Sequence, residues 1–234
     1  ESYNFHLLSQ TIHSFCVNDL GSFYLDIIKD RQYTCKKDSQ ERLSAQHSMY
    51  CITKMLLLWI APICPHTAEE AWSHLPKNKD KSIFYNNWFV IEDSIIGKSN
   101  INDDNWNCVL EIKKIVSKAL EEKRSENIIG SPLDADVVLH CSSELKNILN
   151  VFENELKFIF ITSSVTLNKL NNKVSDTIEI DNNKISVAIK NSPNNKCDRC
   201  WHKCATVGED KKYNNICSRC ISNVYGDGEI RKNA

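Results

Sequence analysis

The stretch that decides the C-terminal fold opens with Cys197-Asp-Arg-Cys200 and closes with Cys217-Ser-Arg-Cys220. Two Cys-x-x-Cys pairs at this separation can surround one Zn²⁺ tetrahedrally, because each pair reverses the backbone tightly enough to bring both sulfurs to the ion. The pattern therefore predicts a zinc knuckle whose ligands are the thiolates of Cys197, Cys200, Cys217 and Cys220. A redox pair is the alternative, but such a pair usually occurs once, between a strand and a helix.

Other side chains of the knuckle suggest what it binds. Arg199 and Arg219 lie inside the two pairs, and Trp201 directly follows the first. Guanidinium groups and aromatic rings suit contact with an unpaired nucleic acid strand, so these three residues are predicted RNA or DNA contacts. For Trp201 the alternative is a cover over the metal site. Cys204 and His202 are spare ligands that could replace one of the four cysteines.

Charge and composition limit the classes of protein that fit. The formal net charge of -1 excludes a uniformly basic surface, so any nucleic acid contact must come from local patches. The 41% apolar and 25% charged content is ordinary for a globular protein.

Most of the eleven cysteines lie outside any framework spacing, which indicates reduced thiols of the cytoplasm. No apolar run approaches the roughly 18 residues of a membrane span. The chain starts at Glu1, and we expect it to be a piece of a longer protein.

The first half of the chain is predicted to be a helical bundle. Apolar side chains recur at helical spacing over residues 5–20 and again over residues 43–58, where the helix should stop near Pro62. Residues 22–28 are ambiguous between a strand and a buried helix. Thr67-Ala-Glu-Glu70 has the spacing of a capping box, and Asn102 can cap a helix with an apolar stripe from Trp106 to Leu120.

A small α+β part is predicted after Gly130-Ser-Pro132. Residues 136–140 look like a strand, Ser142-Ser143 can cap a helix, and residues 158–161 form an apolar run of uncertain type. A hairpin is predicted from residues 177–180 and 184–189 about a turn at 181–183. The predicted fold class is mainly α with a smaller α+β part. Its domains are a helical bundle at 1–126, an α+β connector at 127–193 and the knuckle at 194–234.

No catalytic constellation is recognisable in the sequence. A nucleophile, a base and an oxyanion site do not occur together, and there is no glycine-rich phosphate loop. Asp26 and Asp30, close to Lys29 and Arg31, form a dense charged turn that fits a structural ion network at least as well as a site.

Three stretches together resemble the C-terminal part of the bacterial isoleucine–tRNA ligases (isoleucyl-tRNA synthetases), a class I aminoacyl-tRNA synthetase family. They are Phe23-Tyr-Leu-Asp-Ile-Ile-Lys-Asp-Arg-Gln-Tyr33, Ala61-Pro-Ile-Cys-Pro-His-Thr-Ala-Glu-Glu-Ala-Trp72 and the cysteine pairs followed by Ile221-Ser-Asn-Val-Tyr-Gly-Asp-Gly-Glu-Ile-Arg-Lys232. The first two resemble the helical anticodon-binding domain, and the third is typical of the isoleucine enzyme.

The resemblance implies that the chain recognises the anticodon stem-loop of isoleucine tRNA. The parent enzyme would use ATP and Mg²⁺ to attach isoleucine and would edit mischarged valine. Its His-Ile-Gly-His-like and Lys-Met-Ser-Lys-Ser-like motifs are absent here, so we expect the catalytic and editing domains to lie N-terminal to this segment of the same chain, a cytoplasmic monomer. The cysteines carry over as ligands of one Zn²⁺, Arg199 and Trp201 as anticodon-loop contacts, and Lys29, Arg31 and Arg42 as contacts to the RNA backbone.

Two rivals remain. One is a DNA-repair glycosylase with a similar zinc finger, which would need its own catalytic N-terminus. The other is a non-enzymatic zinc module for protein contact, which predicts that Trp201 is buried and that RNA does not bind.

Overall fold

The computed structural model describes residues 4–76, 81–88, 101–170, 177–180 and 183–233. The chain forms two compact units, one of residues 1–26 and 42–99 and the other of residues 27–41 and 100–234. The predicted fold class is confirmed: helices dominate, a four-stranded sheet follows, and four cysteines gather near the C-terminus. The finer domain boundaries after residues 126 and 193 stay a prediction.

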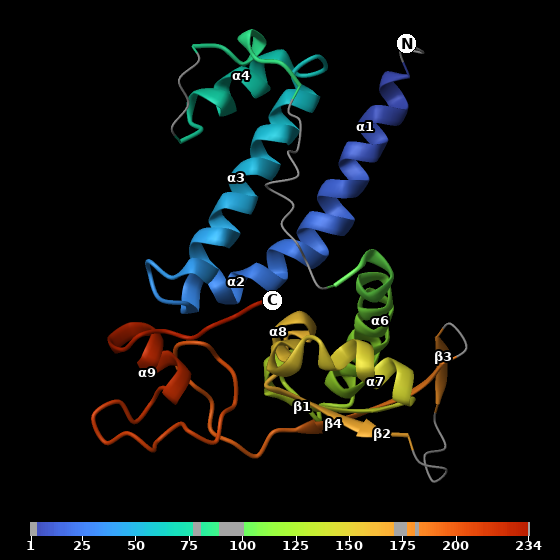
Figure 1. Ribbon diagram of the computed structural model, residues 1–234, viewed down its shortest axis with the longest axis vertical. Helices are drawn as coiled ribbons and strands as arrows, with labels where there is room; N and C mark the ends of the chain where they lie inside the picture. The colour runs from blue at the N-terminus through green and yellow to red at the C-terminus, as the bar shows by residue number, and fades with distance from the viewer. Residues whose placement is uncertain (1–3, 77–80, 89–100, 171–176, 181–182, 234) are drawn as a thin grey trace. The chain divides into compact units, whose positions relative to one another are not determined.

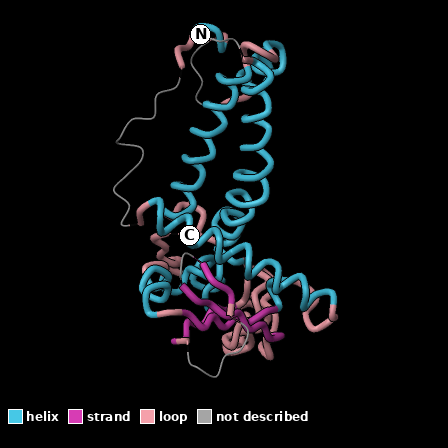
Figure 2. The backbone as a smooth tube through the Cα atoms, turned by 90° about the vertical axis from the view of Figure 1, so that its right-hand side faces the viewer, coloured by secondary structure: helices cyan, strands magenta, loops and turns pink. Residues whose placement is uncertain are grey.

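The N-terminal half is helical, as Figures 1 and 2 show. Its elements are α1 (Phe5–Ser14), a π-helical segment (Phe15–Tyr24), α2 (Leu25–Thr34), α3 (Gln40–Ile60), α4 (Pro65–Ser73) and a 3-10 turn (Ile83–Tyr85). The ambiguous residues 22–28 are therefore helical, and Ile27 and Ile28 are buried. The predicted helix end near Pro62 is confirmed. The apolar stripe of α1 is largely exposed, with Phe5 at 50%.

The core of the first unit lies where α3 meets α4. The buried side chains are Leu57, Leu58, Ala61, Ala68, Trp72, Leu75 and Ile83. The predicted capping box at Thr67 is wrong, because α4 begins two residues earlier, at Pro65. Proline is favoured at the first helical position, where its missing N–H would have no partner anyway. Glu69 instead accepts hydrogen bonds from Ser82 Oγ (3.1 Å) and the Ile83 amide (3.0 Å).

In the second unit α6 (Asp103–Ser125) follows the predicted pattern. Asn102 caps it by accepting a 2.8 Å hydrogen bond from the Asn105 amide. The buried stripe runs from Cys108 to Leu120 and matches the predicted apolar face.

The sheet has the strand order β2-β1-β4-β3. Its strands are β1 (Ala135–Cys141), β2 (Ser164–Lys169), β3 (Ile178–Ile180) and β4 (Asn183–Asn191). β1 is parallel to β2, with Val137 beside Val165, and antiparallel to β4, with Val137 beside Ile189. The predicted hairpin is confirmed as the antiparallel β3–β4 pair, while Asp181 and Asn182 of its turn lie outside the described residues.

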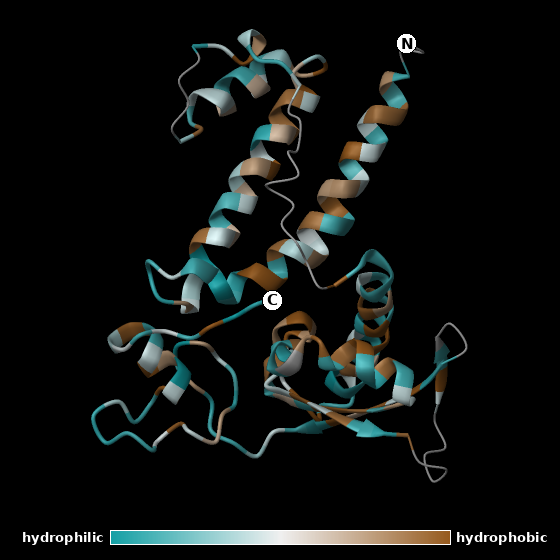
Figure 3. Ribbon diagram, in the orientation of Figure 1, coloured by the Kyte–Doolittle hydropathy of each residue, from teal (hydrophilic) through white to brown (hydrophobic). Residues whose placement is uncertain are grey.

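Helices cover one face of this sheet, as Figure 1 shows. The parallel β1–β2 connection contains α7 (Ser143–Asn150), a 3-10 turn (Glu153–Glu155) and α8 (Leu156–Phe160), which pack on the sheet together with α6. The uncertain run at 158–161 is thus mostly helix. Figure 3 shows that most residues of α8 are hydrophobic. Alternate residues of β1 are buried, as expected for a strand covered on one side.

After β4 the chain enters the cysteine region, which ends in α9 (Ser218–Tyr225). Among the described residues, no helix combines the length and the apolar character needed to cross a membrane.

Candidate metal centre

Four cysteine sulfurs converge between the turn at 197–200 and the start of α9. All ligand atoms of Cys197, Cys200, Cys217 and Cys220 lie within 4.8 Å of one another, and the residues are at most 6% exposed. The Sγ atoms of Cys197 and Cys220 are 3.7 Å apart, and those of Cys200 and Cys217 are 3.8 Å apart. A tetrahedron with Zn–S bonds of ~2.3 Å has edges of about 3.8 Å, so these two distances match edges of a zinc site.

Backbone hydrogen bonds shape the first half of this site. The Trp201 amide donates to the Cys197 carbonyl (2.9 Å), and the Cys197 amide donates to the His202 carbonyl (2.9 Å). The turn requires a left-handed backbone at Trp201, with φ of 64°. The Cys217 amide points at Cys197 Sγ from 3.3 Å, a donor that stabilises a thiolate.

The spare ligands lie beside the four-sulfur group and outside it. Cys204 Sγ is 3.8 Å from the His202 carbonyl oxygen. Hydrogen bonding with Cys204 lowers the pKa of the Cys200 thiol and raises that of Cys204, which favours a thiolate inside the group and a thiol next to it. The His202 ring is buried, with Nδ1 3.1 Å from the Cys200 carbonyl oxygen and its plane edge-on to Phe158.

The two knuckle arginines are bonded to α2. Arg199 donates from Nη1 to the Thr34 carbonyl (2.6 Å) and from Nη2 to the Tyr33 carbonyl (3.2 Å). It therefore caps the C-terminal end of α2, where a cation is favoured by the helix dipole. Arg219 makes a two-pronged ion pair with Asp30, with N–O distances of 2.8 and 2.9 Å.

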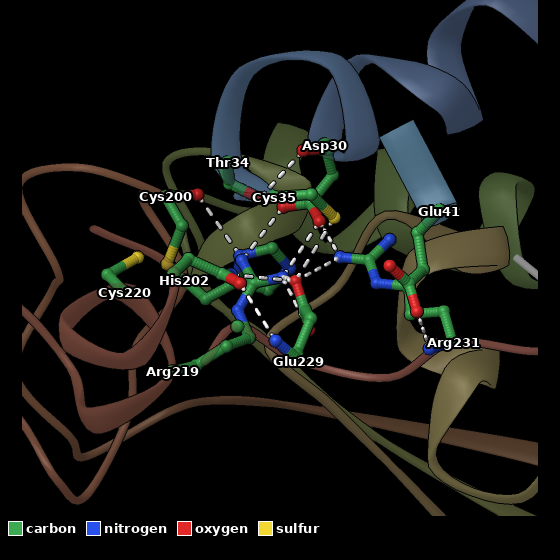
Figure 4. Close-up of polar contacts among 12 residues, drawn as sticks. Asp30, Thr34, Cys35, Glu41, Cys200, His202, Arg219, Cys220, Glu229 and Arg231 are labelled. Carbon is green, nitrogen blue, oxygen red and sulfur yellow. Dashed lines mark hydrogen bonds and ion pairs between the residues drawn. The ribbon is translucent and has the colours of Figure 1, made fainter. Parts of the chain in front are cut away.

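Arg219 belongs to a group of four charged side chains, here called the charge cluster: Asp30, Arg219, Glu229 and Arg231. Figure 4 shows both guanidinium groups and the Glu229 carboxylate close to Asp30. Burial by itself raises the pKa of Asp30, but the hydrogen bonds and charges of Arg219 and Arg231 outweigh it and hold this pKa well below its usual range. The pKa of Glu229 is also lowered, because the same arginines outweigh its burial.

Trp201 is 61% exposed. Most of the ring is therefore accessible from solvent, which favours contact with a partner over a role as a cover for the metal site.

The comparison with known families bears on the helical half. Residues 1–139 match the family described as the anticodon-binding domain of tRNA ligase. The chain belongs to this anticodon-binding family. A second match covers residues 194–223 and is described as the zinc finger found in FPG and IleRS.

Curated relatives of this anticodon-binding chain are named isoleucine–tRNA ligase. The protein from Shewanella woodyi is 39% identical over 232 residues, which cover 99% of this chain and 25% of the relative. The protein from Teredinibacter turnerae is 42% identical over 231 residues, with the same coverage. That from Blochmanniella pennsylvanica is 42% identical over 232 residues, covering 98% of this chain and 25% of the relative. The chain thus spans about a quarter of the length of these relatives, and the expected resemblance is confirmed.

The predicted site residues of this anticodon-binding chain are divided between the two units. The cysteines, Arg199, Trp201, Arg219 and the α2 residues Lys29 and Arg31 belong to one unit, whereas Arg42 belongs to the other. Lys29 is exposed, and Arg31 and Arg42 are half-buried. The assignment of these basic residues to RNA contacts stays a prediction.

Sequence reasoning missed two members of the charge cluster. Glu229 and Arg231 lie in the C-terminal segment that carries the family resemblance. That resemblance was the one signal in the sequence that pointed to this segment. Asp30 lies in the charged turn for which an ion network was considered, and the structure confirms the network for this residue.

Proposed function

We propose that this chain holds the anticodon stem-loop of isoleucine tRNA as part of an isoleucine–tRNA ligase. The observation that carries the proposal is the match of residues 1–139 to the anticodon-binding domain, in a chain that also has the four-cysteine cluster. The whole enzyme would attach isoleucine to its tRNA with ATP and Mg²⁺. It would hydrolyse mischarged valine at a separate editing domain. Valine lacks one methylene of isoleucine, and binding alone rejects such a substrate poorly. Those activities would belong to N-terminal domains of the same cytoplasmic, monomeric protein.

One structural zinc ion is proposed at Cys197, Cys200, Cys217 and Cys220. Sulfur spacings of 3.7 and 3.8 Å support it, as does the zinc-finger match over the same residues. Four thiolates leave no open coordination position, so the ion would brace the knuckle and take no part in catalysis.

The RNA would be read by two kinds of contact. Basic residues of the helical part, Lys29, Arg31 and Arg42, would position the stem through its phosphates. The exposed ring of Trp201 would stack on a base of the loop, where unpaired bases can be splayed out. Arg199 and Arg219 lie in the same knuckle, with guanidinium groups that already bond Thr34 and Asp30.

The rival functions are less well supported. The anticodon-binding match extends over the helices that a DNA-repair glycosylase would have to replace with a catalytic domain. A module devoted to protein contact predicts a buried Trp201, and this side chain is 61% exposed.

The zinc assignment is tested by metal analysis of the purified chain. We expect one zinc per chain in the wild type, loss of the zinc in Cys197→Ser, and full retention in Cys204→Ser, the matched control just outside the site. Because structural zinc sites supply folding free energy, a chelator should also unfold the knuckle. Equal zinc content in both variants would contradict the assignment.

The tRNA proposal is tested by binding of isoleucine tRNA and an unrelated tRNA to the wild-type chain, with and without chelator. We expect tighter binding of isoleucine tRNA and a loss of this preference when zinc is removed. Equal affinity for the two tRNAs would overturn the proposal.

A further inference from the structure

The charge cluster joins three segments that are far apart in the sequence. Asp30 comes from α2, Arg219 from α9, and Glu229 and Arg231 from the C-terminal residues 226–233, here called the strap. The side chains are only 15, 16, 15 and 1% exposed, respectively. Two negative and two positive charges compensate one another there. Removing any one of them would leave a buried charge without compensation, which is strongly unfavourable.

Phe158 of α8 connects the cluster to the knuckle. The guanidinium carbons of Arg231 and Arg219 lie 3.5 and 5.0 Å from its ring centroid. The His202 ring packs edge-on against the same phenyl group, with centroids 5.8 Å apart. His202 directly follows Trp201, so contacts run without a gap from Asp30 to the residue proposed to stack on RNA.

The strap forms hydrogen bonds to other segments of the second unit at several of its residues. Lys36 donates to the Gly226 carbonyl (3.0 Å), and the Glu229 amide donates to Asn223 Oδ1 (2.9 Å). Farther on, the amides of Lys232 and Asn233 donate to the Glu155 carboxylate at 2.6 and 2.7 Å. The strap thus binds to α9, to the loop after α2 and to the 3-10 turn before α8.

We propose that the charge cluster positions the knuckle for RNA binding, and that Arg219 acts through Asp30 without touching the RNA. This assignment rests on the proposed function. The geometry supports it because both terminal nitrogens of Arg219 donate to Asp30 and Phe158 lies against its guanidinium group. Arg199 likewise directs both terminal nitrogens to carbonyls of α2. Both arginines are therefore bonded within the chain, whereas the exposed aromatic ring of Trp201 can reach a base. The two arginines would fix the position of the knuckle that carries this ring.

The substitution Asp30→Asn separates this role from direct contact. If Arg219 bound a phosphate, the change would loosen its guanidinium and remove a negative charge, so isoleucine tRNA would bind equally well or more tightly. For a positioning cluster we expect the affinity to fall about 2- to 30-fold, as for other residues that act through a coupled network. The dependence of log K on log salt should keep its wild-type slope, because no phosphate contact is lost. Loss of one such contact changes this slope by about 0.7 to 1.

Asp227→Asn is the matched control, since it makes the same chemical change at an exposed residue of the strap. Zinc content and the unfolding midpoint are measured for each variant, and binding is compared well below that midpoint. A purely structural role predicts wild-type affinity for the folded Asp30→Asn chain, and that result would overturn the proposal, as would tighter binding.

Arg219→Lys serves if Asp30→Asn does not fold. Lysine still binds phosphate as a point charge but cannot reproduce the two-pronged pair with Asp30. We expect weaker tRNA binding at an unchanged salt slope, whereas full retention of affinity would overturn the positioning role. Failure of the wild-type chain to prefer isoleucine tRNA would instead reject the proposed function, so the two failures are distinguishable.

Discussion

Trp201 holds a left-handed backbone that residues with a Cβ atom rarely adopt. Two hydrogen bonds hold this turn, one from the Trp201 amide to the Cys197 carbonyl and one from the Cys197 amide to the His202 carbonyl. A non-glycine residue there costs about 1 to 2 kcal/mol relative to glycine. A tryptophan at a place where glycine would be more stable indicates that its exposed ring has a use beyond the fold.

Replacing Trp201 by glycine and by alanine therefore separates fold from function. We expect Trp201→Gly to retain zinc and to be about 1 kcal/mol more stable than Trp201→Ala, because glycine relieves the backbone strain. Both variants should lose about 1 to 3 kcal/mol of tRNA binding free energy, the usual contribution of one stacked base. Urea unfolding and tRNA titration measure the two effects. Wild-type affinity in either variant would refute the stacking role.

Cys35 and Cys64 should differ in thiol reactivity. Cys35 is 4% exposed, and burial raises its pKa to about 12, with Glu229 as a neighbour at 3.4 Å. Cys64 is exposed. Since the thiolate is the nucleophile, alkylation near pH 8 should modify Cys64 and spare Cys35. Mass spectrometry of the modified chain measures the labelling, and equal labelling of both cysteines would show that Cys35 is not buried in solution.

At the scale of elements, the strap depends on one glycine. Gly228 has φ of 91°, and a Cβ there would lie 3.2 Å from Lys36 Cβ. We expect Gly228→Ala to destabilise the chain by about 1 to 3 kcal/mol, because both the backbone and the packing are strained.

Asp227→Ala is the matched control for this change, an exposed neighbour that should stay within about 0.5 kcal/mol of the wild type. Equilibrium unfolding in urea measures the difference. Equal stability of the two variants would show that the strap is not seated against Lys36 in solution.

Elements with strong local signals were predictable from the sequence. The apolar stripe of α6 and the caps Asn102 and Ser142 are confirmed, because period and capping act within a few residues. β2 was missed, since its residues lie at the edge of the sheet and are only partly buried, which leaves little alternation to detect. The capping box predicted at Thr67 has the correct residue spacing but is wrong, because the helix starts earlier, at Pro65.

The candidate site divides in the same way. The four cysteines follow from the spacing of each pair, a local property that survives without knowledge of the fold. The charge cluster could not be derived, because Asp30 lies 189 residues from Arg219 and 201 residues from Arg231. Only the folded chain shows which of many charges meet.

For the molecule as a whole, the cluster predicts an acid-sensitive stability. The pKa values of Asp30 and Glu229 are lower in the folded chain than in the unfolded one. Their contribution to the free energy of unfolding is therefore complete above the unfolded pKa values, about 3.9 and 4.3, and is lost as the pH falls below them. We expect the free energy of unfolding to decrease from about pH 4 downward, and less steeply in Asp30→Asn. Because acid would also release the proposed zinc ion, the measurement compares the two chains at equal zinc content over the same pH series. Parallel curves would exclude a contribution from Asp30.

The long separation of the cluster's partners also has a consequence for the newly made protein. At about 5 to 20 residues per second, the ribosome needs roughly 10 to 40 s to go from Asp30 to Arg219. Throughout that interval α2 lacks its ion pair with Arg219, and for most of it α2 also lacks the cap from Arg199, which is made shortly before Arg219. The second unit therefore cannot mature in the order in which it is synthesised. One of its earliest segments lacks these contacts until nearly two hundred further residues have been translated.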